Sequence, residues 1–228
     1  MTDSRARVRR SLPGLAIEGV PFIGASAGLT ALTALFSRRA ALLPLALTGM
    51  VTYFFRDPER ETPADTPYLH AAADGLITAI DEIDEPRFIK GPATRIVTFL
   101  SVFDVHINRM PAAGTVRYRD YVPGEFRAAW DKEADTANER AYVGLETAHG
   151  PVLVVQIAGL VARRIVTWPS LGEEMGAGER FGLIKFGSRT DLIFPRGAAT
   201  PLVKKGQKVQ GGITRMGEWH AQPTIVGS

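Results

Sequence analysis

The 228-residue sequence contains no cysteine. This absence excludes a disulfide framework, a thiolate nucleophile and any metal site built on cysteine. Histidine is scarce too, with four in the chain, and neither their spacing nor the scattered acidic residues suits a metal site, so none is expected. The sequence also has no internal repeat and no glycine-rich phosphate-binding loop ahead of a helix.

Charge of one sign is hardly in excess, with 27 Lys and Arg residues against 24 Asp and Glu. The formal net charge of +3 is too small to indicate a nucleic-acid partner, and no row of basic residues alternates with aromatic ones. A slight basic excess does suit an anionic membrane surface. With 45% hydrophobic residues, the chain can build one substantial domain or two small ones around a real core.

Apolar residues are concentrated in residues 12–55, which follow an arginine-rich start and are divided by Arg38 and Arg39. We predict that residues 1–56 form a membrane-associating helical hairpin, which lies in or dips into one leaflet with arginines at the headgroups. Two transmembrane helices are an alternative, although the second stretch is short for a span of about 20 residues. A cleaved signal peptide would need a shorter apolar region, and a pair of buried core helices would need most of a small domain to cover it.

Residues 57–228 have the texture of a β-rich domain. Turn signals at short intervals separate β-branched and apolar runs, as is typical of an all-β sandwich or barrel. The predicted fold is therefore mainly β (α+β), with a sandwich-like or barrel-like domain after the apolar hairpin. Strands are predicted at 75–80, 95–100, 151–158, 164–168 and 182–186, and the polar segment 131–140 is predicted as a loop or short helix.

The segment 203–212 predicts a C-terminal hairpin that resembles those of lipoyl and biotinyl carrier domains. Gly206 is expected in a tight turn between short strands. Carriers present a lysine at the hairpin tip, and Lys204, Lys205 and Lys208 are available for that role. A non-enzymatic, membrane-tethered lipoyl-like binding module is therefore one alternative function.

Four further segments contain residues that could carry chemistry, although each also fits an ordinary structural role. Ser188 follows Gly187, and a serine hydroxyl can attack a preceding glycine carbonyl if a base removes its proton, but a Gly-Ser step is also a common turn. Asp74 precedes Gly75, as in many turns. His106 lies in a polar run, 103–111, where a structural histidine is equally at home. The fourth segment, 157–166, also reads as a buried strand followed by a solvated arginine pair.

Together these segments resemble the phosphatidylserine decarboxylases, in particular the short prokaryotic form. The resemblance extends over nearly the whole chain, and the order and number of the motifs are more specific than any one of them. The matching segments are 54–60, 73–75, 104–109, 138–140, 157–166, 180–182 and 186–189.

The resemblance implies a self-processing enzyme that cleaves its own chain between Gly187 and Ser188. Ser188 would become a pyruvoyl group, the cofactor, which forms a Schiff base with the serine amine of phosphatidylserine and accepts electrons when carbon dioxide leaves. His106 would be the base and Asp74 would orient it. Fragments 1–187 and 188–228 would remain associated as a heterodimer, with a higher oligomer also open. The product would be phosphatidylethanolamine.

The sequence departs from longer family members at one point of this implied site. Those members have two histidines three positions apart, whereas here only His106 is present and Arg109 occupies the second place. The catalytic histidine of the long forms corresponds to that second place. His70, His149 and His220 therefore remain fallback candidates for the base.

A phospholipid substrate requires a cation for its phosphate and a location at the bilayer. Arg109, Arg163, Arg164 and Arg189 are available for the phosphate, each with a solvated or structural role as the alternative. The expected location is the cell membrane, peripheral or monotopic, on the cytoplasmic face, with the lipid surface as a partner. An archaetidylserine decarboxylase and a serine hydrolase that uses Ser188 without self-cleavage are further alternatives, and the second lacks the Gly-x-Ser-x-Gly elbow.

Overall fold

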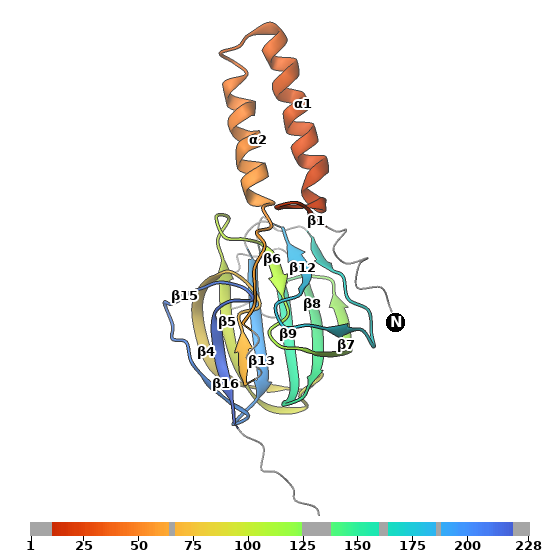
Figure 1. The fold of residues 1–228 in the computed structure, drawn as a ribbon, viewed down its shortest axis with the longest axis vertical. Coiled ribbons are helices and arrows are strands. Elements are labelled where there is room, and N and C mark those ends of the chain that lie inside the picture. The colour runs from red at the N-terminus through yellow and green to blue at the C-terminus, as the bar shows by residue number, and fades with distance from the viewer. Residues whose placement is uncertain (1–10, 64–66, 125–137, 160–163, 186–187, 221–228) are drawn as a thin grey trace, which may run out of the picture. The chain divides into compact units, whose positions relative to one another are not determined.

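The structure, a computed structural model, describes residues 11–63, 67–124, 138–159, 164–185 and 188–220. The chain divides into two compact units, Met1–Glu59 and Arg60–Ser228. The predicted change of texture at residues 56 and 57 lies three residues before this division. Figure 1 shows a helical first unit and a second unit built from strands.

The first unit is the predicted helical hairpin (Figure 1). A 3₁₀ turn, η3 (Ile17–Gly19), leads into α1 (Val20–Phe36), and α2 (Leu42–Phe54) follows. Pro21 lies in the first turn of α1, where a missing amide hydrogen is tolerated. The first helix begins later than expected, because Gly14 adopts a φ of +77° and residues on either side of it pair as β1 (Ser11–Leu12) and β2 (Leu15–Ala16).

Small residues let the two helices approach each other, while large apolar side chains point outward. Thr30 Oγ1 lies 3.2 Å from Thr48 Oγ1 on the other helix. Leu35, Phe36 and Leu43 are more than three-quarters exposed, at 81%, 84% and 80%. The segment Ile17–Phe36 is long and apolar enough to cross a membrane, whereas Leu42–Phe54 is shorter.

The second unit is organised around an eight-stranded antiparallel sheet that curls on itself (Figure 1). Its middle strand is β13, which pairs with β9 on one side and with β5 on the other. In spatial order the strands are β11 (Glu174–Met175), β7 (Gly114–Val122), β8 (Arg140–Thr147), β9 (Gly150–Ala158), β13 (Ser188–Pro195), β5 (Gly91–Leu100), β4 (Gly75–Glu85) and β15 (Lys208–Val209).

Two three-stranded sheets complete the unit. One has the order β10 (Ile165–Thr167), β12 (Arg180–Ile184) and β6 (Ile107–Arg109), and it contacts β8 and β9 of the large sheet. The other has the order β14 (Ala199–Pro201), β16 (Arg215–Trp219) and β3 (Tyr68–His70). The main core contains buried side chains from the large sheet and from both small ones, among them Leu192, Phe181 and Met216. The predicted mainly β fold is confirmed.

The five predicted strands correspond to β4, β5, β9, β10 and β12, with ends that shift by up to five residues. The strands β7, β8 and β13 were not predicted. Gly206 does lie in a turn, with a φ of +86°, but the strands on either side of it pair with different partners. β14 pairs with β16 and β15 pairs with β4, so the segment is less like a simple carrier hairpin than expected.

Candidate active site

Ser188 is the first residue of the central strand β13. Its Cα partners are Leu100 at the end of β5 and Ala158 at the end of β9, and its side chain is fully buried. The Ser188 hydroxyl has no hydrogen-bond partner among the residues that the structure describes. A buried hydroxyl normally has one, and exceptions are found where a group has a chemical role. Gly187, the other half of the predicted cleavage site, lies outside the described residues.

His106 is held by a tight loop directly after β5. The Asp104 carboxylate closes this loop by accepting hydrogen bonds from the Ser101 amide (2.8 Å) and hydroxyl (2.7 Å). His106 is buried, and its Nδ1 lies 3.0 Å from the Asp104 carbonyl oxygen. A carbonyl can only accept, so Nδ1 carries the hydrogen, and in the neutral ring the basic lone pair is on Nε2.

The strand pairing brings His106 and Ser188 to the same end of the unit. Asn108 on β6 pairs with Gly182 on β12, and the ladder continues until the His106 carbonyl accepts the Ile184 amide (3.3 Å). Ile184 is four residues before Ser188 in the sequence. His106, directly before β6, and Ser188, the first residue of β13, therefore both lie close to the end of β12.

A side-chain hydrogen bond also connects β6 to β13, two residues along the chain from His106 and from Ser188. Asn108 Nδ2 donates to the Thr190 hydroxyl (3.3 Å), and both side chains are buried. Thr190 is two residues from Ser188 and Asn108 is two residues from His106. Since residues two apart on a strand share a face, Ser188 lies on the face of β13 that meets Asn108. His106 lies directly before β6 at this end of the unit.

Asn108 belongs to a buried polar network that crosses the interior. Gln156 Nε2 donates to Asn108 Oδ1 (2.8 Å), and Thr167 Oγ1 donates to Gln156 Oε1 (2.8 Å). Gly182 makes room for this network, because a Cβ at that position would collide with the Val166 carbonyl and lie 3.0 Å from Gln156 Nε2. The network joins β6, β9, β10 and β13, and a satisfied buried network of this kind favours a single arrangement.

The Asp74 carboxylate is anchored by an arginine and a backbone amide. It accepts two hydrogen bonds from the Arg60 guanidinium, at 2.5 and 2.8 Å, and one from the Gly211 amide at 2.8 Å. The two bonds from Arg60 form a bidentate ion pair, the stronger geometry for a guanidinium and a carboxylate, and the orienting of His106 by Asp74 stays a prediction. Asp74 nevertheless lies near the site, because the neighbouring Ala72 carbonyl accepts the Arg109 amide (2.9 Å).

Two of the arginines predicted to bind phosphate, Arg109 and Arg189, are buried, whereas Arg164 is exposed. Arg109 is 3% exposed, and its Nη1 donates to the Gly178 carbonyl (3.1 Å). Arg189 is 8% exposed and forms a bidentate pair with Asp191, at 2.6 and 2.8 Å. These values leave little of either guanidinium accessible to a lipid headgroup. Arg163 lies outside the described residues.

Two of the fallback histidines lie far from Ser188. His149 is in the turn between β8 and β9, at the end of β9 opposite Ala158, and stacks on Trp219. His220 contacts Thr200 and the Gly197 carbonyl, beyond the far end of β13. Eight strand residues separate each region from Ser188, which is roughly 25 Å along a strand. His70 is buried on β3, four residues before Asp74.

The surroundings of Ser188 on the β9 side are apolar. Ala158, its partner on β9, packs with Ala141, Ile165 and Ile184 in a buried cluster. The Asn138 side chain donates to the Ala158 carbonyl (2.7 Å), so the 138–140 motif secures this end of β9. Within the described segments, no group of three His, Asp or Glu side chains is arranged to hold a metal ion.

Several residues that build the site could not be recognised from the sequence. Arg60 is the last residue of the matching segment 54–60, and nothing else in the sequence indicated that it would bind Asp74. Gln156 looked like any residue of a buried strand, and Thr190 like part of a turn. Their importance depends on long-range pairing, which periodicity does not reveal.

Comparison with known proteins finds related sequences over most of the chain. Residues 47–217 match the profile of the family described as phosphatidylserine decarboxylase. A phosphatidylserine decarboxylase proenzyme of Symbiobacterium thermophilum is 51% identical over 207 residues, covering 90% of this chain and 95% of that protein. Proteins of the same name from Carboxydothermus hydrogenoformans and Desulfotalea psychrophila are 42% and 43% identical, over 88% and 90% of this chain and 94% and 96% of their own lengths.

Proposed function

The chain belongs to the phosphatidylserine decarboxylase family, and on that premise we propose that it decarboxylates phosphatidylserine to phosphatidylethanolamine after cutting itself between Gly187 and Ser188. The observation that carries the proposal is the buried Ser188 hydroxyl at the start of β13, at the same end as His106. The relatives are named proenzymes, which suits a chain that must be processed before it acts.

In the proposed self-cleavage the Ser188 hydroxyl attacks the Gly187 carbonyl carbon while His106 Nε2 takes the hydroxyl proton. The peptide C–N bond breaks and an ester to Ser188 Oγ forms. Removal of the Ser188 α-proton then expels the Gly187 carboxylate. Hydrolysis of the resulting enamine releases ammonia and leaves a pyruvoyl group on the fragment 188–228.

The residues around Ser188 fit that group. When present, the pyruvoyl ketone supplies an electron sink for the pair left behind by departing carbon dioxide. The apolar cluster of Ala141, Ala158, Ile165 and Ile184 favours loss of a carboxylate charge, because it offers that charge little solvation. His106 is the proposed donor of the proton that replaces the carboxylate.

For Asp74 we propose a positioning role. Its carboxylate is engaged by Arg60 and Gly211, which anchors the segment before β4. The Ala72 carbonyl in that segment accepts the Arg109 amide and so supports β6, the strand that follows His106. Asp74 would thus orient His106 through the backbone.

The helical hairpin is proposed to hold the enzyme at the membrane. Leucines and phenylalanines are exposed along both helices of the hairpin, as suits contact with lipid. A substrate with two acyl chains rarely leaves the bilayer, so the enzyme must reach it there. We therefore propose a peripheral or monotopic location, with the cytoplasmic face expected and Arg38 and Arg39 at the headgroups. Fragments 1–187 and 188–228 would remain paired, because β13 lies between β5 and β9.

The test compares Ser188→Ala and His106→Gln with the matched controls Ser170→Ala and His149→Gln. Wild type and both controls should yield two fragments on denaturing electrophoresis and release phosphatidylethanolamine from mixed micelles of phosphatidylserine. Ser188→Ala should remain one chain and be inactive, and His106→Gln should process far more slowly. Full activity in an unprocessed Ser188→Ala protein would refute the proposal.

A further inference from the structure

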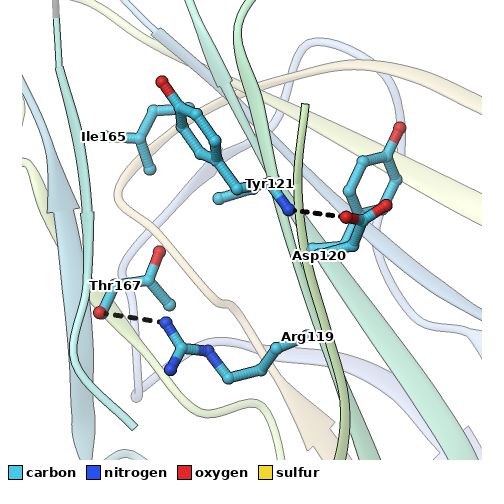
Figure 2. A pocket seen from close by; sticks show the side chains of 7 residues that line it. Arg119, Asp120, Tyr121, Ile165 and Thr167 are labelled. Carbon is cyan, nitrogen blue, oxygen red and sulfur yellow. Dashed lines mark hydrogen bonds between the residues drawn. The ribbon is translucent and has the colours of Figure 1, made fainter. Parts of the chain in front are cut away.

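A cavity of about 440 Å³ is lined by residues of β7, β8 and β10 (Figure 2). It is lined by Arg119, Asp120, Tyr121, Ala141, Tyr142, Ile165 and Thr167. Figure 2 shows Arg119 and Tyr121 directed toward Thr167 and Ile165, whereas Asp120 lies on the other side of its strand. The cavity therefore presents a cation and an aromatic hydroxyl across from an apolar and a polar residue of β10.

Part of the cavity lining lies on the same face of the large sheet as Ser188. Tyr121 pairs with Ala141, Ala141 with Gln156, and Gln156 with Thr190, so these residues form one row across β7, β8, β9 and β13. Directly paired residues project from the same face of a sheet. Thr190 and Ser188 share a face as well, so Arg119, Tyr121 and Ala141 lie on the same side of the large sheet as the serine. The lining residues Asp120 and Tyr142 lie on the other side.

Two structural links connect the cavity to the serine. Ala141 and Ile165 line the cavity and also pack with Ala158, the cross-strand partner of Ser188. Thr167 lines the cavity and donates to Gln156, which leads through Asn108 to Thr190. A ligand that reaches from the cavity to Ser188 would pass over small apolar side chains.

Arg119 has the character of an anion-binding residue. It is exposed, and its one hydrogen bond to a described residue is a long one of 3.4 Å from Nη2 to the Thr167 carbonyl. The neighbouring Asp120 does not neutralise it, because its carboxylate accepts from Arg87 (2.5 Å) and Tyr118 (3.3 Å). Burial, followed by its side-chain hydrogen bond to Glu139, raises the pKa of Tyr121.

We propose that this cavity binds the phosphodiester of the substrate headgroup, with Arg119 as the principal cation and the Tyr121 hydroxyl beside it. Arg164 adds positive charge near Tyr121. Guanidinium suits a phosphodiester because two parallel hydrogen bonds can form. The assignment rests on the proposed decarboxylase function and replaces Arg109 and Arg189, which the fold has buried.

The experiment compares Arg119→Gln with Arg117→Gln, since Arg117 is an exposed arginine on the same strand without a place in the cavity. Self-cleavage is scored first by denaturing electrophoresis. Inhibition by glycerophosphoserine, which carries the phosphodiester without acyl chains, is then measured on processed enzyme. Trapping of serine methyl ester by cyanoborohydride reduction reports amine capture without a phosphate.

We expect Arg119→Gln to process normally and to bind glycerophosphoserine about tenfold more weakly, the loss expected for one charge-assisted contact. Its trapping of serine methyl ester should stay within about twofold of wild type, and Arg117→Gln should match wild type in both assays. The proposal fails if Arg119→Gln binds glycerophosphoserine like Arg117→Gln. It also fails if both ligands weaken equally. A wild type that stays one chain would refute the proposed function instead.

Discussion

The hydrogen bond from Asn108 to Thr190 offers a sharp test of how His106 and Ser188 are aligned. Thr190→Val replaces the hydroxyl with a methyl group and removes the acceptor at 3.3 Å, without changing the size of the side chain appreciably. Asn108 Nδ2 then keeps a single distant contact, 3.5 Å from the Ala72 carbonyl. The amide of Asn108 stays bound to Gln156 through its oxygen.

The magnitude follows from burial. Asn108 is 0% exposed, so water cannot reach the donor that loses its partner. Leaving a buried donor unsatisfied costs about 1–3 kcal/mol. If the transition state of self-cleavage needs the same alignment, a loss of about 1.4 kcal/mol slows it roughly tenfold.

The assay is the rate at which freshly synthesised chain is converted into two fragments, followed by denaturing electrophoresis. The matched control is Thr98→Val, because Thr98 is the Cα partner of Thr190 on β5, is equally buried, and makes no side-chain hydrogen bond to a described residue. Thr98→Val should process at the wild-type rate. Equal rates for the two variants would refute the idea that the network aligns the serine.

Two further predictions concern stability. The Glu85 carboxylate accepts hydrogen bonds from the backbone amides of residues 87–89, at 2.8–3.0 Å. In urea denaturation, Glu85→Ala should therefore lower the free energy of unfolding by about 1–3 kcal/mol. The control Glu82→Ala, at an exposed position, should change it by less than about 0.5 kcal/mol. The hydrogen bond from Arg95 holds the pKa of Asp81 below its usual 3.8, so the pair stabilises the fold above that pH and the benefit is lost as pH falls through the lower folded value. At neutral pH, urea denaturation should give wild type a higher free energy of unfolding than Asp81→Asn. The difference should be less than about 1 kcal/mol, because the carboxylate is partly exposed. A difference that persists at strongly acidic pH would contradict this prediction.

The sequence predicted the fold where local pattern decides it. The long apolar stretch gave the hairpin, and β-branched runs gave strands such as β5 and β9. It failed on β13, because Arg189 and Asp191 made that strand look like a polar turn. In the fold these two charges neutralise each other on one face, while Ser188, Thr190 and Leu192 occupy the other.

The site was predictable as a set of positions but not as a set of contacts. The family resemblance implied that Ser188, His106 and Asp74 belong to one site, and the strands bring the first two to one end of the unit. Which cation meets Asp74 depends on Arg60 arriving from the start of the second unit, which no local pattern encodes. No local pattern marks Arg119 either, because its proposed role depends on its position in the cavity beside β10.

The most direct measurement is the intact mass of the purified protein before and after treatment with a hydrazine. We predict two polypeptides, the smaller beginning at residue 188 with a mass lower than that of the serine-initiated fragment by one molecule of ammonia, and with one carbonyl that reacts with the reagent. A single species at the full 24.7 kDa with no reactive carbonyl would contradict the account.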